Sequence, residues 1–194
     1  MKPEIIFASQ NKGKTSEIAT LIGDRFQLLN LADKGIVQEL DEPFDTLQEN
    51  ALCKAKQVFQ MTGIPSFADD TGLEIDALNG KPGVYSARYA GEEKDPQKNM
   101  DKILAELHGS PNRKARFRTV IAFVDGQQEK IFEGEVIGTI TLEKHGKKGF
   151  GYDPVFRPDG SEKTFGQMEM EEKNKFSHRA RAMEKFIAFL NTNS

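Results

Sequence analysis

The pattern that most restricts the fold lies in the middle of the chain, where two long strand-like segments flank a tight turn. From Ala115 to Val124 the side chains alternate between two faces, and one face carries two Phe and one Ile, which is typical of a strand. Asp125-Gly126 is a common hairpin turn, and we expect the returning strand to reach Leu142. Such a long hairpin excludes a purely parallel sheet.

Strands and helices alternate in the part of the chain before this hairpin. We expect a buried strand from Glu4 to Ala8 and a polar loop from Ser9 to Lys14. A helix should follow and end before Gly23, with a second strand from Phe26 to Leu31. Together with the hairpin, this alternation predicts an α/β fold with a mixed sheet.

Three further helices are indicated by residues that favour helix starts. Thr46 and Glu49 form a capping box, which predicts a helix from there to about residue 62. Asp95 followed by Pro96 predicts the start of another helix, and the last helix is expected to start near Ser177.

Composition indicates one globular domain over residues 1–194. Of the 194 residues, 37% are hydrophobic and 29% are charged, and 14 Phe supply material for one core. The 27 basic and 30 acidic residues give a formal net charge of −3. This balance argues against nucleic acid as a partner, because general nucleic-acid binders carry a basic surface.

Residue counts and run lengths exclude several other classes. The chain has one cysteine, Cys53, so no intramolecular disulfide can form. With this single cysteine and 3 His, a Cys/His zinc site is not expected. The longest aliphatic or aromatic run, from Val120 to Val124, is far shorter than the roughly 20 residues of a spanning helix, so no membrane partner is expected. The apolar run before Ser9 is too short for a secretory signal, so we expect a cytoplasmic protein.

The loop after the first strand is the first candidate site. Ser9 to Lys14 resembles a Walker A loop, except that Ala8 stands where the first Gly belongs. Backbone N–H groups at a helix N-terminus, the flexible Gly13 and the lysines Lys12 and Lys14 would hold phosphate oxygens. An ordinary strand–helix connection with solvated lysines explains the same residues.

The second candidate is Asp69-Asp70-Thr71-Gly72. We expect this segment to follow directly after a short strand at Ser66 to Ala68. Adjacent carboxylates point in opposite directions on an extended chain, so one can face a site while the other holds the backbone. A carboxylate at a strand end can bind Mg²⁺ or take a proton from water. A solvated turn is the alternative, because Asp and Gly favour turns.

Two later segments carry groups that suit a base. Gly149 to Phe156 places aromatic rings in a loop rich in Gly and Pro, where a ring could stack on a base or anchor the loop to the core. Lys173 is followed by Ser177-His178-Arg179 at an expected helix start, where the His and Arg donors suit the acceptor edge of a base. A Ser-capped helix with exposed charges is the alternative for this segment.

In this order along the chain, the candidate segments resemble the inosine triphosphate pyrophosphatase family, also called XTP/dITP diphosphatases. The resemblance covers nearly the whole chain. One departure is Thr71, where the family more often has Ser, and this change keeps the hydroxyl. The matching segments are Ser9-Gln10-Asn11-Lys12-Gly13-Lys14, Glu49-Asn50-Ala51 with Lys54, Ala68-Asp69-Asp70-Thr71-Gly72-Leu73, Gly80-Lys81-Pro82-Gly83-Val84-Tyr85-Ser86-Ala87-Arg88-Tyr89, Gly149-Phe150-Gly151-Tyr152-Asp153-Pro154, and Glu172-Lys173 with Ser177-His178-Arg179.

The resemblance implies an elongated mixed sheet flanked by helices, two lobes with a central substrate cleft, and a homodimer. It also implies hydrolysis of ITP, dITP or XTP to the monophosphate and pyrophosphate, with Mg²⁺ as the cofactor. Asp70 would accept the proton, and Asp70 and Glu42 would bind the metal, although Glu39 and Asp41 crowd the same loop. The substrate would be bound by Ser9, Gln10, Asn11, Lys12, Gly13, Lys14, Lys54, Thr71, Phe150, Gly151, Tyr152, Asp153, Lys173, His178 and Arg179.

Two other functions are compatible with the residues. A P-loop-like phosphotransferase would use the Ser9 to Lys14 loop, with Val120 to Asp125 as a metal-binding strand, but it leaves the remaining segments without a role. A nucleotide-sensing module would bind without turnover. Against this, carboxylates beside a triphosphate repel it unless Mg²⁺ lies between them.

Overall fold

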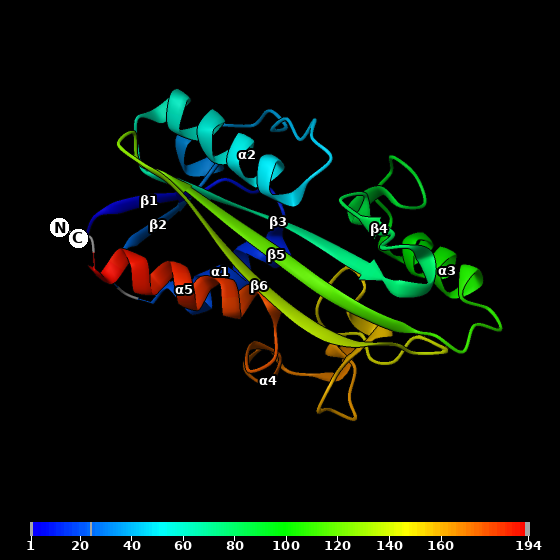
Figure 1. Ribbon diagram of the computed structural model, residues 1–194. Helices are drawn as coiled ribbons and strands as arrows, with labels where there is room; N and C mark the ends of the chain where they lie inside the picture. The colour runs from blue at the N-terminus through cyan, green and yellow to red at the C-terminus, as the bar shows by residue number, and fades with distance from the viewer. Residues whose placement is uncertain (1, 24, 193–194) are drawn as a thin grey trace. The chain divides into compact units, whose positions relative to one another are not determined.

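The computed structural model describes residues 2–23 and 25–192. Within them, the strands form one mixed sheet in the order β2-β1-β3-β5-β6-β7, with β4 paired to β3 (Figure 1). The strands are β1 (Glu4–Phe7), β2 (Gln27–Asn30), β3 (Ser66–Ile75), β4 (Pro82–Gly83), β5 (Lys114–Val124), β6 (Glu129–Ile140) and β7 (Phe156–Pro158). The α-helices are α1 (Lys12–Ile22), α2 (Leu47–Thr62), α3 (Pro96–Glu106), α4 (Met170–Asn174) and α5 (His178–Thr192).

The directions of the strands confirm the mixed sheet that the sequence predicts. β1 pairs in parallel with both β2 and β3, whereas β3–β4 and β6–β7 are antiparallel pairs. The expected turn between β5 and β6 is present, because the Asp125 carboxylate accepts the backbone N–H groups of Gln127 and Gln128, both at 2.9 Å. β6 ends at Ile140, slightly before the expected limit at Leu142.

The chain divides into two compact units. The first unit comprises the described residues of Met1–Asp70, Thr119–Gly134 and Arg179–Ser194, and the second comprises Thr71–Arg118 and Glu135–His178. The central cleft expected from the resemblance stays a prediction, as does the treatment of the whole chain as one domain. No helix among the described residues combines the length and the apolar character that crossing a membrane requires.

In the first unit, α1 and α5 pack on one face of the sheet, and α2 lies on the other face (Figure 1). The apolar core on the α1 and α5 side contains Phe rings from both the strands and α5. Phe67 on β3 stacks against Phe7 on β1 and also touches Phe186 on α5, with ring centroids 5.0 Å apart in each case. This packing fixes α1 and α5, whose charged residues Lys14 and Arg179 contact Asp69 on β3.

Local signals fix the starts of the helices. Thr46 caps α2 as expected: its hydroxyl accepts the Glu49 N–H at 3.2 Å and donates to the Glu49 carboxylate at 2.7 Å. Asp95 caps α3 as expected: its carboxylate accepts the N–H groups of Gln97 at 2.8 Å and Lys98 at 3.3 Å. The expected loop from Ser9 to Lys14 is shorter than predicted, because the Asn11 side chain accepts the Lys14 N–H at 3.1 Å and α1 starts at Lys12.

The predicted end of β3 at Ala68 was wrong, because the strand continues through Asp69-Asp70-Thr71-Gly72 to Ile75. Gly72 permits this continuation within the second unit. A Cβ atom at Gly72 would lie 2.9 Å from the backbone oxygen of Gly83, so only glycine allows β4 to approach this closely. The two carboxylates therefore lie inside a strand rather than in a solvated turn.

Candidate active site

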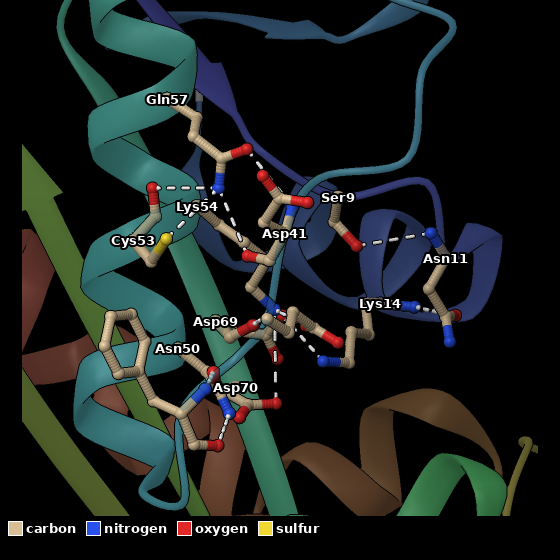
Figure 2. Close-up of polar contacts among 12 residues, drawn as sticks. Ser9, Asn11, Lys14, Asp41, Asn50, Cys53, Lys54, Gln57, Asp69 and Asp70 are labelled. Carbon is tan, nitrogen blue, oxygen red and sulfur yellow. Dashed lines mark hydrogen bonds and ion pairs between the residues drawn. The ribbon is translucent and has the colours of Figure 1, made fainter.

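Two acidic and two basic residues of the first unit meet where β3 passes α1 and α2. Figure 2 shows Asp69 and Asp70 on β3, Lys14 on α1 and Lys54 on α2 pointing toward one another. The expected alternation holds, because the neighbouring carboxylates contact different partners. Asp69 contacts Lys14, whereas Asp70 lies toward Lys54.

The carboxylate of Asp69 is fully buried between two cations. Its Oδ1 atom lies 3.0 Å from Lys14 Nζ, and its Oδ2 atom accepts a hydrogen bond from Arg179 Nε at 3.0 Å. Burial alone would raise the pKa of Asp69. The cations of Lys14, Arg179 and Lys54 outweigh that effect and hold the pKa well below its ordinary value. Asp69 is therefore ionised at neutral pH and acts as a structural anion.

A second buried carboxylate, Glu17 on α1, completes this group. Its carboxylate accepts a hydrogen bond from Arg179 Nη1, and the Arg179 side chain is only 1% exposed. Sequence reasoning missed Glu17. The available signal was its position. Glu17 lies three residues after Lys14, so the two side chains share one face of α1.

Lys54 forms the second part of the charged group. Its Nζ donates to Glu42 Oε1 at 2.5 Å and to the Asp69 carbonyl oxygen at 2.8 Å, and it lies 4.0 Å from Asp70 Oδ1. Burial would lower the pKa of Lys54, but Asp70 and Glu42 outweigh it, so the pKa is raised. The pKa of Asp70 is also raised, chiefly by burial, and Lys54 offsets this only in part.

The acidic loop that carries Glu42 is held by α2. Gln57 donates to the Asp41 carbonyl and accepts the Asp41 N–H, both at 3.1 Å. On the other side of Glu42, Asn50 accepts the Phe44 N–H and donates to the Phe44 carbonyl, both at 2.9 Å. Sequence reasoning did not assign these anchors. Their spacing with Lys54, which places all three on one face of α2, was the available signal.

The donor set suits Mg²⁺ in its chemistry. Among the described residues, no group of three or more His, Cys, Asp or Glu side chains could hold a metal ion by itself. Mg²⁺ is usually held by one or two carboxylates, with waters and substrate phosphates completing its shell. Asp70 and Glu42, which share Lys54 as a neighbour, match that pattern.

The expected phosphate loop lies at the start of α1. Ser9 Oγ accepts the Asn11 N–H at 3.2 Å, which shapes the entry to the helix (Figure 2). Gln10 donates to the carbonyl oxygens of Val37 and Gln38, so in this structure it ties the loop to another segment. Lys12 is exposed and Gly13 is half-buried, whereas Lys14 points inward with a side chain that is 15% exposed.

In the second unit, Asp153 organises the aromatic loop. Its Oδ2 atom accepts the Phe150 N–H at 2.8 Å and a hydrogen bond from Lys173 Nζ at 2.6 Å. The Lys173 ammonium also lies 4.9 Å from the centre of the Phe150 ring, a cation–π distance. The half-buried Phe150 is thus held from two sides.

The remaining expected base-binding residues lie in different surroundings. Tyr152 is buried and donates its hydroxyl to the Ser86 carbonyl at 2.7 Å, so its ring anchors the loop to the second unit's core. His178 is buried and stacks on Phe117 with ring centroids 4.7 Å apart, while Thr71 and Gly151 are half-buried. Arg179 is directed to Asp69 and Glu17 in the first unit, and its assignment to a base stays a prediction.

We expect Glu17→Ala to destabilise the protein by about 3–5 kcal/mol, because it leaves a buried guanidinium with one carboxylate fewer. Glu17→Gln should recover part of this loss, since its amide oxygen can still accept from Arg179. Chemical denaturation followed by circular dichroism measures both. Ser16→Ala, at an exposed neighbour on α1, is the control and should change stability by less than about 0.5 kcal/mol. Equal effects at positions 16 and 17 would contradict a structural role for Glu17.

Two glycines of the aromatic loop offer a matched test. Gly149 and Gly151 both have left-handed backbones, with φ of 72° and 60°. A Cβ atom at Gly149 would lie 2.0 Å from Asp153 Oδ2, whereas one at Gly151 would meet nothing within 4 Å. Alanine at either site should lower the free energy of unfolding by about 1–2 kcal/mol, because a Cβ atom disfavours the left-handed backbone conformation. Gly149→Ala should lower the thermal midpoint further, because it displaces the carboxylate that holds Phe150; equal midpoints would contradict this.

Comparison with known proteins gives matches along almost the whole chain. The model of the Ham1 family matches residues 5–189. A relative named dITP/XTP pyrophosphatase from Flavobacterium psychrophilum is 45% identical over 186 residues, which cover 96% of this chain and 98% of the relative. A relative of the same name from Bacillus subtilis is 44% identical over 191 residues, covering 96% of each.

Solved structures agree with these sequence matches. The structure of the Staphylococcus aureus Ham1 protein has a TM-score of 0.89 and 37% sequence identity, and it covers 98% of this chain and 100% of that one. The structure of a HAM1 protein from Coxiella burnetii also has a TM-score of 0.89, at 36% identity, over 98% of this chain and 99% of that one. The resemblance expected from the sequence is confirmed, and the chain belongs to the Ham1 family.

Proposed function

We propose that this chain hydrolyses deaminated or oxidised purine nucleoside triphosphates (ITP, dITP and XTP) between the α- and β-phosphates, giving the monophosphate and pyrophosphate. The observation that carries the proposal is the buried Asp70 carboxylate, whose pKa is raised and which has Lys54 and Glu42 beside it. The names of the relatives, dITP/XTP pyrophosphatase, support the substrate class.

In the proposed reaction, Asp70 accepts a proton from the attacking water. A raised pKa makes its carboxylate a stronger base than an ordinary Asp side chain, which favours proton transfer near neutral pH. Lys14 and the N–H groups at the start of α1 would hold the phosphates and balance the charge that grows on the departing pyrophosphate. Lys54 would contribute a second cation.

Mg²⁺ is the proposed cofactor, held by Asp70 and Glu42. When bound, it would neutralise phosphate charge and orient the phosphoanhydride for in-line attack. The loop anchors described above support the choice of Glu42 over its acidic neighbours. Glu42 contacts Lys54, whereas Asp41 is exposed and is held through its backbone.

The second unit would supply the contacts to the base. Phe150 offers an aromatic face, and Lys173 is a donor for the O6 acceptor that hypoxanthine and xanthine share. Adenine presents an amino donor at that place, so it would leave a donor unpaired. The remaining contacts proposed for this unit are Thr71, Gly151, Tyr152, Asp153 and His178, and Arg179, which belongs to the first unit, is the last proposed contact.

We also propose a homodimer of one catalytic domain per chain, acting in the cytoplasm. The resemblance to the family is the support for this assembly. Sedimentation velocity of the purified chain tests it, and a single species at the monomer mass would refute it.

Product analysis after incubation with ITP and Mg²⁺ tests the reaction. Pyrophosphate is the expected product; orthophosphate or a phosphorylated acceptor would indicate a phosphotransferase, and bound but unchanged ITP a sensing module. Asp125 already argues against the phosphotransferase, because its carboxylate caps the hairpin turn where a metal-binding strand end was needed.

Asp70→Asn should reduce kcat by at least about 10²–10⁴-fold, because an amide cannot accept the proton. Thermal stability should be kept or raised. The raised pKa means that folding favours the neutral form of Asp70, so ionised Asp70 opposes folding at neutral pH. Asp159→Asn, at an exposed carboxylate, is the control. Activity within a factor of about three of the wild type would remove Asp70 from the mechanism.

Lys14→Ala should raise the KM for ITP and lower kcat, with kcat/KM falling about 100-fold or more, because the lysine that faces the phosphates is lost. Lys12→Ala should change kcat/KM only a few-fold, since Lys12 is exposed. Steady-state kinetics of both variants, with thermal midpoints to confirm folding, make the comparison. A larger effect at Lys12 would mean that the exposed lysine binds the triphosphate.

A further inference from the structure

The ammonium group of Lys54 lies between the two carboxylates that the proposed function assigns to the metal. Lys54 Nζ is 2.5 Å from Glu42 Oε1 and 4.0 Å from Asp70 Oδ1. The Lys54 and Asp70 side chains are 8% and 12% exposed, so water screens their contact less than it would at a surface, while Glu42 is 36% exposed. The Lys54 ammonium therefore already occupies the position to which the two carboxylates would attract a metal ion.

We propose that Lys54 occupies the cation position of the free protein, and that a divalent metal binds there only when a triphosphate draws the ammonium away. This inference rests on the proposed function, because it takes Glu42 and Asp70 as the metal ligands. Lys54 is then a residue that sets the order of binding, in addition to contacting substrate.

Electrostatics explains why the ammonium and the metal exclude each other. The ammonium of Lys54 lies 2.5 Å from one carboxylate and 4.0 Å from the other, so it already compensates part of the negative charge that would attract a metal. A divalent ion entering between the same oxygens would meet the ammonium at close range and repel it. Mg²⁺ would also have to give up part of its tightly held water without the help of phosphate oxygens.

A triphosphate changes this balance. Its phosphate oxygens offer Lys54 several new acceptors, and the lysine stem is long and flexible enough to turn toward them. Once the ammonium has moved, the negative charges of Glu42 and Asp70 are no longer compensated by Lys54. A divalent metal that binds between them removes their mutual repulsion, so metal binding becomes favourable. Metal and nucleotide therefore bind with positive coupling.

A purely structural role is the alternative, since Lys54 also donates to the Asp69 carbonyl at 2.8 Å. The two roles predict opposite results in a binding measurement that needs no turnover. If Lys54 excludes the metal, replacing its ammonium with an uncharged group strengthens metal binding to the free protein. If Lys54 only supports the strand, the same change weakens metal binding or leaves it unaltered.

The experiment titrates Mn²⁺, a spectroscopic substitute for Mg²⁺, into the nucleotide-free protein and follows free Mn²⁺ by electron paramagnetic resonance. Lys54→Met keeps the length of the side chain and removes its charge; we expect it to bind Mn²⁺ at least about tenfold more tightly than the wild type. Lys56→Met is the matched control. Lys56 lies on the same helix, pairs with Glu129 at 2.8 Å and is 40% exposed, so its removal should change the affinity less than twofold, within ordinary screening of surface charge.

Adding Glu42→Gln to Lys54→Met should abolish the gain, which places the tighter site at these carboxylates. If Lys54→Met fails to fold, Lys54→Gln, which keeps a donor for the Asp69 carbonyl, takes its place. Unchanged or weaker Mn²⁺ binding in a folded Lys54 variant overturns the inference. Turnover of the wild-type protein is measured separately, so that tighter Mn²⁺ binding by Lys54→Met combined with a wild type that does not hydrolyse ITP would refute the proposed function alone.

Discussion

In the first unit, the buried carboxylate of Asp69 holds three elements in one arrangement. Lys14 belongs to α1 and Arg179 to α5, while Asp69 itself lies on β3. Because a buried charge that loses its partner is costly, neither helix can slide along the sheet without leaving one charge uncompensated. The positions of Lys14 and Asp70, which carry the proposed chemistry, follow from this constraint. Charge pairing therefore specifies the packing of this unit together with its Phe-rich core.

Both proposed functional regions repeat one principle, in which a carboxylate or amide holds a backbone segment so that a neighbouring side chain is oriented. In the first unit, Asn50 and Gln57 bind backbone groups on either side of Glu42. In the second unit, Asp153 binds the backbone of Phe150 and pairs with Lys173. Glu42 and Phe150 lie in loops, but residues on helices and other fixed positions determine where those loops lie.

The sequence predicted the features that depend on neighbours along the chain. Thr46 and Asp95 cap their helices as expected, and Asp125-Gly126 makes the hairpin turn. Features that depend on distant partners were not predicted. β3 continues past Asp69 because cations from α1 and α5 compensate the carboxylate, and the Glu17–Arg179 pair joins residues 162 positions apart. The short elements α4 and β7 were missed because they contain too few residues to show a period.

The separation between Glu17 and Arg179 has a consequence for synthesis on the ribosome. The first unit is assembled from three stretches of chain, and the last of them begins at Arg179. While the polypeptide emerges, Glu17 and Asp69 therefore lack their shared cation until residue 179 has been added. A nascent chain arrested before α5 carries two carboxylates directed toward a core that lacks both the guanidinium and the Phe186 ring. The charge pairs of the first unit can therefore close only after Arg179 and the helix that carries it have been synthesised.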